Sequence, residues 1–203
     1  MTKYRGIGVM CGVLLVVGAV ALLAWWLQRP HGLGRIENEY PWQKATISVG
    51  GHECVVEYCK FGSGVTVEAK PYWRQATRTP EDAAAAELTC LRTGGTVDDY
   101  LKLYAKPEER REVLTAIYGN MDEFLKSNRE IRQAMLLGTL KYNDLSIVVV
   151  KAAVNDEPDP WVITGLCYIK HDGQYRAVKK PDTPILRWLS QNDYLLKEDG
   201  DGK

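Results

Sequence analysis

Residues 145–154, with the sequence LSIVVVKAAV, are the stretch that decides the fold. When this segment is extended, apolar side chains occupy both of its faces, which is typical of a strand at the centre of a sheet. The Asn143-Asp144 pair before it and the Asp172-Gly173 pair further on are turn signals. The sequence therefore predicts an antiparallel sheet in which three further strands pair around this one, over residues 136–142, 161–170 and 174–179.

An earlier β segment is expected over residues 46–72. Apolar and polar side chains alternate in residues 46–49 and again after the Gly50-Gly51 turn, with the period of a strand that buries one face. A second glycine-rich turn follows at Gly62-Ser63-Gly64. These signals predict a hairpin or a three-stranded meander ahead of the helices.

Residues 79–133 predict four helices. Thr79 has the side chain of an N-cap, Pro80 suits the first helical position, and Gly94-Gly95 ends the first helix. The other three helices are expected over residues 96–104, 107–118 and 121–133, and a short closing helix is expected over residues 181–195. Together with the strands, this pattern predicts an α+β domain.

An uncharged apolar segment, GIGVMCGVLLVVGAVALLAWWL, occupies residues 6–27. As a helix it would be about 33 Å long, enough for a hydrocarbon core of about 30 Å, so it predicts one transmembrane helix. Lys3 and Arg5 favour a cytoplasmic location for the tail at residues 1–5. The alternative is a cleaved signal peptide, because Ala19-Val20-Ala21 has the small-x-small form of a cleavage site. Both alternatives predict a domain outside the cytoplasm, in the periplasm or at the cell surface.

The expected organisation is a single-pass membrane protein with its N-terminus in the cytoplasm and one folded domain outside. A linker is expected over residues 28–44, the domain over residues 45–195 and a disordered tail over residues 196–203. Gly8 and Gly12 form a GxxxG pattern in the apolar segment, which can bring two helices close together. A homodimer is therefore left open.

The charge balance restricts the class of partner. The chain has 26 basic and 26 acidic residues, so its net charge is zero. Residues 1–28 hold Lys3 and Arg5 and no acid, so the rest of the chain carries a net charge of −2. A weakly acidic domain without a basic stripe does not fit phosphate-driven nucleic-acid binding. The expected partners are the membrane and other envelope proteins, and the identity of a small-molecule ligand is left open.

The cysteines of the predicted domain are Cys54, Cys59, Cys90 and Cys167. They permit two disulfides or four free thiols, and the sequence leaves both open. Cys54 and Cys59 would lie about 16 Å apart in an extended strand, too far for a bond between them unless a turn intervenes. The spacing of His52, Cys54 and Cys59 also lacks the close cysteine pairs of structural zinc sites, so no metal site is predicted.

Patterns in the helical segment and in the last hairpin are similar to those of a known family. Residues 79–84 have the sequence TPEDAA, and after Gly94-Gly95 residues 98–104 have the sequence DDYLKLY. The last hairpin contains DGQYRAV at residues 172–178. Over about residues 79–180 this pattern resembles NTF2-like domains of the cystatin-like α+β superfamily. The resemblance implies helices on a curved antiparallel sheet that forms a cone, here behind an N-terminal transmembrane helix and an extra N-terminal hairpin or meander.

The four later strands contain no Asp, Glu or His, which argues against an isomerase or dehydratase site in the cone. The side chains expected to line a cavity are Tyr142, Lys151, Trp161 and Tyr168, while Glu87, Asp98 or Asp99 could point inward from the helices. No catalytic residue, cofactor or metal is predicted. The sequence favours a membrane-anchored extracytoplasmic binding or interaction module, with assembly of an envelope or secretion complex as a variant. The alternative is an enzyme of isomerase, dehydratase or hydrolase type that uses the cavity.

Overall fold

In a computed structural model of the chain, the described residues are 40–49, 51–129, 131–154, 161–179 and 185. The expected apolar helix at residues 6–27 and the expected tail at residues 196–203 lie outside them. The closing helix expected at residues 181–195 also lies outside them, apart from Ile185.

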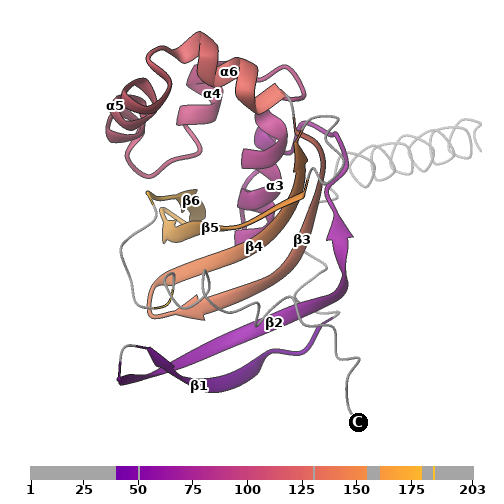
Figure 1. The fold of residues 1–203 in the computed structure, drawn as a ribbon, viewed down its shortest axis with the longest axis vertical. Coiled ribbons are helices and arrows are strands. Elements are labelled where there is room, and N and C mark those ends of the chain that lie inside the picture. The colour runs from indigo at the N-terminus through magenta and orange to yellow at the C-terminus, as the bar shows by residue number, and fades with distance from the viewer. Residues whose placement is uncertain (1–39, 50, 130, 155–160, 180–184, 186–203) are drawn as a thin grey trace, which may run out of the picture. The chain divides into compact units, whose positions relative to one another are not determined.

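A six-stranded antiparallel sheet forms the centre of the described domain, and its strands follow one another in chain order. They are β1 (Gln43–Val49), β2 (His52–Thr66), β3 (Ile131–Tyr142), β4 (Leu145–Val154), β5 (Trp161–His171) and β6 (Gln174–Ala177). Figure 1 shows that β3 and β4 bend around a helix that packs on one face of the sheet. The sheet is thus a continuous meander.

The central position predicted for residues 145–154 is confirmed. β4 pairs with β3 on one side and with β5 on the other, and Val148 and Val150 are fully buried. Both predicted turns are present as well: Asn143 and Asp172 adopt positive φ angles of 52° and 50°. Short polar residues tolerate this conformation, which a tight hairpin requires.

The β segment before the helices differs from the prediction. β1 and β2 form the expected hairpin, but β2 continues to Thr66 as one 15-residue strand in place of two shorter ones. The register between β2 and β3 shifts between Lys60 and Val65, where Gly62 and Gly64 have φ angles of 53° and 93°. These glycines therefore form a bulge that bends the strand without reversing it, because β3 pairs with β2 on both sides of the bulge.

The helices named within the described ranges are η1 (Tyr72–Arg74), α3 (Pro80–Cys90), α4 (Val97–Leu101), α5 (Pro107–Tyr118) and α6 (Met121–Arg129). The predicted N-cap is confirmed: the Thr79 hydroxyl accepts from the Asp82 amide, and the Asp82 carboxylate accepts from the Thr79 amide. The fourth predicted helix was expected to reach residue 133, but α6 ends at Arg129 and β3 begins at Ile131. Pairing with β4 takes these residues into the sheet.

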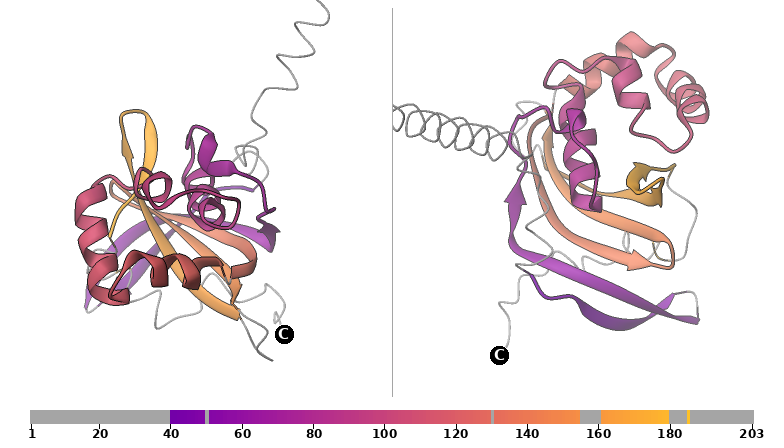
Figure 2. Two further views of the ribbon diagram at one scale, coloured as in Figure 1. Left: turned by 90° about the horizontal axis from the view of Figure 1, so that it is seen from above. Right: turned by 180° about the vertical axis from the view of Figure 1, so that it is seen from behind.

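Two apolar clusters lie on opposite faces of the sheet. The first packs beneath α3, whose residues Ala83–Ala86 are all buried and allow the helix backbone to lie close to the strands. The second contains Ile147, Cys167 and the fully buried Ile185. Figure 2 shows α3 within the bend of the sheet and α4, α5 and α6 gathered at one end of it.

Two predictions are corrected by this architecture. The predicted fold class is wrong. The early β hairpin was expected as an addition to a separate cone, but β2 pairs with β3, so the hairpin is part of one six-stranded antiparallel sheet with few helices. The second correction concerns the predicted transmembrane helix and extracytoplasmic location. None of the helices in the described ranges has both the length and the apolar character needed to cross a bilayer.

Candidate functional site

Four side chains from α3, α4, the turn after α4 and β5 form one hydrogen-bonded group, which we name the Glu87 cluster. Oε1 of Glu87 accepts from the hydroxyls of Tyr100, at 3.2 Å, and Tyr104. Oε2 of Glu87 accepts from the Tyr168 hydroxyl at 2.8 Å. The hydroxyl oxygens of Tyr100 and Tyr104 lie 2.9 Å apart. Three phenols from two elements and a turn thus converge on one carboxylate of α3.

Local geometry explains the convergence. Tyr100 lies in α4, and Tyr104 follows in a hydrogen-bonded turn, where the Leu103 amide donates to the Tyr100 carbonyl and the Tyr104 amide donates to the Leu101 carbonyl. Beyond α4, the segment is held against β6 because the Ala177 amide donates to the Leu103 carbonyl at 2.8 Å and the Ala105 amide donates to the Ala177 carbonyl at 2.9 Å. Tyr168 stands opposite Ala177 in the β5–β6 register. The sheet edge therefore fixes the positions of Tyr104 and Tyr168.

Burial keeps the three phenols neutral. It raises the pKa of Tyr100, Tyr104 and Tyr168, and the neighbouring Glu87 charge raises each of these pKa values further. A neutral phenol donates a hydrogen bond, and a carboxylate can accept about four. Glu87 is therefore heavily engaged as an acceptor, and its role in this arrangement is to hold three tyrosines in place.

Arg110 of α5 lies next to the Glu87 cluster. Its guanidinium carbon is 4.7 Å from the centroid of the Tyr104 ring, and its Nη2 donates to the Tyr100 hydroxyl at 3.5 Å. Burial alone would lower the pKa of Arg110, but Tyr104, Tyr100 and Glu87 outweigh it and the pKa is raised. The Nε hydrogen is buried and has no hydrogen-bond partner among the described residues. Arg110 is thus a fixed cation whose donors are only partly used by this part of the protein.

A cleft of about 440 Å³ lies between α5 and β5–β6, beside this arginine. Figure 1 shows the positions of α5 and β6, which carry part of its lining. Its apolar lining includes Val113, Ile169 and Val178. The charged residues around it are Lys106, Glu109, Arg110, Glu112 and Lys179. The cleft therefore combines apolar walls with charged groups, which fits a small molecule that has both kinds of surface.

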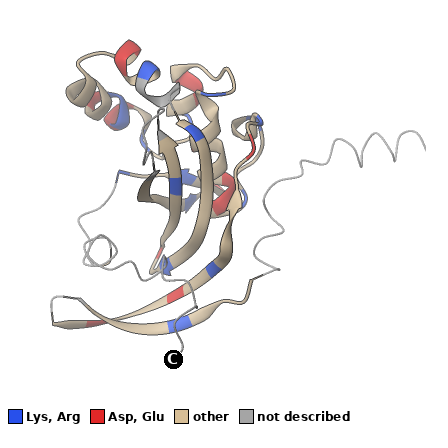
Figure 3. Cartoon of the chain, turned by 45° about the vertical axis from the view of Figure 1, so that its right-hand side comes forward, with Lys and Arg blue, Asp and Glu red and all other residues tan. Residues whose placement is uncertain are grey.

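The charged residues of the domain are unevenly distributed. Figure 3 shows them mainly on the helices, while β3 and β4 carry few. Lys106 of the cleft is paired with Glu109, with 2.6 Å between Nζ and Oε1. Arg110 forms no ion pair with another described residue. Lys179 likewise forms no ion pair within the described ranges, whereas Arg110 is also held in place by Tyr104 and Tyr100.

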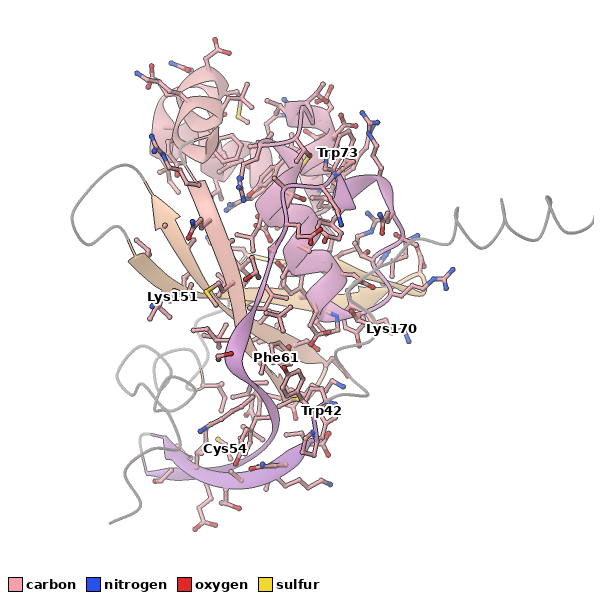
Figure 4. The ribbon with its side chains drawn as sticks, turned by 90° about the vertical axis from the view of Figure 1, so that its right-hand side faces the viewer. Trp42, Cys54, Phe61, Trp73, Lys151 and Lys170 are labelled. Atoms are coloured by element: carbon pink, nitrogen blue, oxygen red, sulfur yellow. The ribbon has the colours of Figure 1, made fainter. Side chains whose placement is uncertain are left out.

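Of the side chains predicted to line a cavity, the three that the structure describes, Tyr142, Lys151 and Tyr168, do not come together. Tyr168 is fully buried and belongs to the Glu87 cluster. Tyr142 packs partly against the apolar cluster on the opposite face of the sheet, and Lys151 also points to that face, since Val150 and Ala152 point toward α3. Figure 4 shows Lys151 far from Lys170 on β5. Trp161 begins β5, but its side chain lies outside the described residues.

The four cysteines of the domain are buried, and none forms a disulfide with another described residue. Cys59 and Cys90 belong to the apolar cluster beneath α3, and Cys54 and Cys167 belong to the cluster on the opposite face. Burial raises the pKa of Cys90 to about 12, so this thiol stays protonated at neutral pH. In the ranges that the structure describes, no group of His, Cys, Asp and Glu side chains is suited to hold a metal ion.

The helix acids named from the sequence have different roles. Glu87 points inward, whereas Asp98 is exposed and pairs with Arg111 at 2.8 Å, and Asp99 caps α4 through Thr96. In the sequence, the position of Glu87 between Ala83–Ala86 and Leu88 indicates an inward side chain, and the structure buries these neighbours. Arg110 was missed, because nothing in the helical pattern separates it from its exposed neighbours.

No protein-family model, curated protein or solved structure matches the chain. These comparisons identify no NTF2-like domain, so that resemblance stays a prediction from the sequence patterns.

Proposed function

We propose that the domain is a non-catalytic module that binds a small molecule in the cleft between α5 and β5–β6. The observation that carries the proposal is the contrast between two neighbouring features. The polar side chains of the Glu87 cluster form hydrogen bonds with one another. The cleft beside them combines open volume with Arg110, a cation that has no ion pair among the described residues. A rigid polar support next to an open, partly apolar cleft favours recognition.

The dimensions of the cleft support this function. Ligand sites in proteins commonly have volumes of about 300–1,000 Å³ and apolar walls with a few polar groups. The 440 Å³ cleft has apolar walls at Val113, Ile169 and Val178. It is placed on backbone that is held firmly, because residues 103–105 are hydrogen-bonded to Ala177. Such a site is formed before the ligand arrives, which lowers the entropic cost of binding.

The contacts do not favour the alternative of an enzyme. General acid–base catalysis requires a group that can exchange a proton with the substrate near the working pH. Glu87 is engaged by three phenols, and the pKa values of Tyr100, Tyr104 and Tyr168 are all raised away from neutrality. The cluster is therefore better suited to hold a shape than to transfer a proton.

Filling the cleft should remove binding. In the full chain, Val113→Trp places an indole in the cleft. We expect the affinity for the fluorescent apolar anion 8-anilinonaphthalene-1-sulfonate to fall about tenfold or more. A tenfold loss of affinity corresponds to about 1.4 kcal/mol of binding free energy. Fluorescence titration with the dye measures the effect. The matched control is Ile117→Trp, on the same helix but 66% exposed and away from the cleft lining.

The control should bind the dye within about twofold of the unmodified chain, because surface substitutions have small effects. Melting temperatures establish that both variants are folded. Equal dye binding by the Val113→Trp and Ile117→Trp proteins would contradict the proposed function, because the dye would then bind elsewhere.

A further inference from the structure

The charges that line the cleft favour an anion of low charge. Lys106, Arg110 and Lys179 are basic and Glu109 and Glu112 are acidic, so the lining itself has an excess of one positive charge, while the Glu87 carboxylate outside the lining also acts on Arg110. The Lys106–Glu109 pair at 2.6 Å neutralises two of these groups. A ligand with several negative charges, such as a phosphate, would meet the two carboxylates, whereas a single negative charge is balanced by the excess cation.

Arg110 is the group that the geometry prepares for this anion. Its guanidinium is fixed on two sides, by the Tyr104 ring at 4.7 Å and by the Tyr100 hydroxyl at 3.5 Å. Stacking on an aromatic ring leaves the planar edge of a guanidinium available for hydrogen bonds. Arg110 has no ion pair among the described residues, and its Nε has no hydrogen-bond partner there. Because this Nε is buried, the donors that Arg110 can offer to the cleft are those of its two terminal nitrogens, of which Nη2 also donates to Tyr100.

The planar fork of a guanidinium matches a carboxylate, which accepts two parallel hydrogen bonds from it. The walls next to Arg110 are apolar, at Val113 on α5 and at Ile169 and Val178 on the strand side. A ligand that satisfies both parts has an apolar body and one carboxylate. The Glu87 cluster has a positioning role, because Tyr100 and Tyr104 hold Arg110 and are themselves held by Glu87.

We propose that the ligand of the cleft is an apolar monocarboxylate, and that Arg110 binds its carboxylate while the α5 and β5–β6 side chains enclose its apolar body. This inference rests on the proposed function and deepens it by naming the chemical class of the ligand. Tyr104 forms the boundary between the two regions, since it lines the cleft and also stacks against Arg110.

The experiment compares two probes of nearly identical shape on the full chain, 1-naphthaleneacetate and its neutral amide, 1-naphthaleneacetamide. Isothermal titration calorimetry at low salt should show that the acid binds about tenfold or more tightly than the amide, because hydrogen bonds to a charged group are the stronger kind. Arg110→Gln should remove most of this preference while it leaves the affinity for the amide within about twofold. An unfolded variant would bind neither probe, so the comparison separates the loss of charge recognition from unfolding.

The matched control is Arg111→Gln, which removes the same charge from the next residue of α5, where the side chain pairs with Asp98 and does not line the cleft. It should keep the preference for the acid. Equal binding of acid and amide by the unmodified chain would overturn the monocarboxylate inference while the proposed function stands. If Val113→Trp changes the binding of neither probe, the proposed function itself is wrong, so the two failures are distinguishable without a variant of Arg110.

Discussion

Replacing Glu87 with alanine is expected to lower the free energy of unfolding by about 3–6 kcal/mol, because each buried polar group that loses its partner costs about 1–3 kcal/mol. Tyr100, Tyr104 and Tyr168 all donate to this carboxylate, and all three are buried. Glu87 is partly exposed whereas the three hydroxyls lie on buried residues, so water can replace the lost acceptor only in part. Denaturation by urea, followed by far-ultraviolet circular dichroism, measures the change.

Two further variants test the cause of this loss. Glu87→Gln keeps the shape and one acceptor oxygen but turns an amide donor toward the phenols, so we expect a loss of about 1–3 kcal/mol, less than that of the alanine variant. Glu53→Gln makes the same chemical change at an exposed position of β2 and should stay within about 0.5 kcal/mol of the unmodified chain. A loss below about 1 kcal/mol for Glu87→Ala would show that the cluster does not support the domain.

The second large effect is expected at high pH. Folding raises the pKa of Tyr100, Tyr104 and Tyr168, by burial first and by the Glu87 charge second, whereas the same phenols in the unfolded chain titrate near about 10. The contribution of these neutral phenols to the free energy of unfolding is therefore fully present below about pH 10. It is lost as the pH rises above that value, because only the unfolded chain then releases the phenol protons. Each phenol contributes about 1.4 kcal/mol per pH unit, so three remove about 4 kcal/mol per unit.

A domain with about 5–15 kcal/mol of stability should thus unfold cooperatively within a few pH units above 10. Absorbance at 295 nm, which detects ionised tyrosine, should rise in the same transition as the loss of circular dichroism. Tyr168→Phe removes one of the three phenols, and the slope of stability against pH should fall by about 1.4 kcal/mol per pH unit. A gradual titration of all tyrosines without a step would contradict the assigned burial of the cluster.

The sequence predicted much of the sheet because its signals are local. β4 is apolar on both faces, and the pairs Asn143-Asp144 and Asp172-Gly173 have the short polar side chain or the glycine that positive φ angles need. The same kind of signal failed at Gly62 and Gly64. A glycine with positive φ serves a turn and a bulge equally well, and only the pairing with β3 decides between them.

The candidate site was less accessible from the sequence because it depends on which residues meet. Tyr168 was named as a cavity residue and lies in the Glu87 cluster, but Tyr142 and Lys151 point to the other face of the sheet. Their faces follow from the strand register, which the sequence alone does not fix. Arg110 interacts with Tyr100, ten residues away, across the turn between α4 and α5, and helical periodicity carries no information on such a contact.

The chain order of the six strands has a consequence for how the sheet assembles in time. Three of its hairpins, β1–β2, β3–β4 and β5–β6, close over turns of a few residues. In contrast, β2 ends at Thr66 and β3 begins at Ile131, with η1 and α3–α6 between them. Closing so long a loop costs more chain entropy than forming a hairpin, and contacts between distant residues slow folding. The seam between β2 and β3 should therefore join last, and pulse-labelled hydrogen exchange would show amides of the β3–β4 hairpin protected before those that cross this seam.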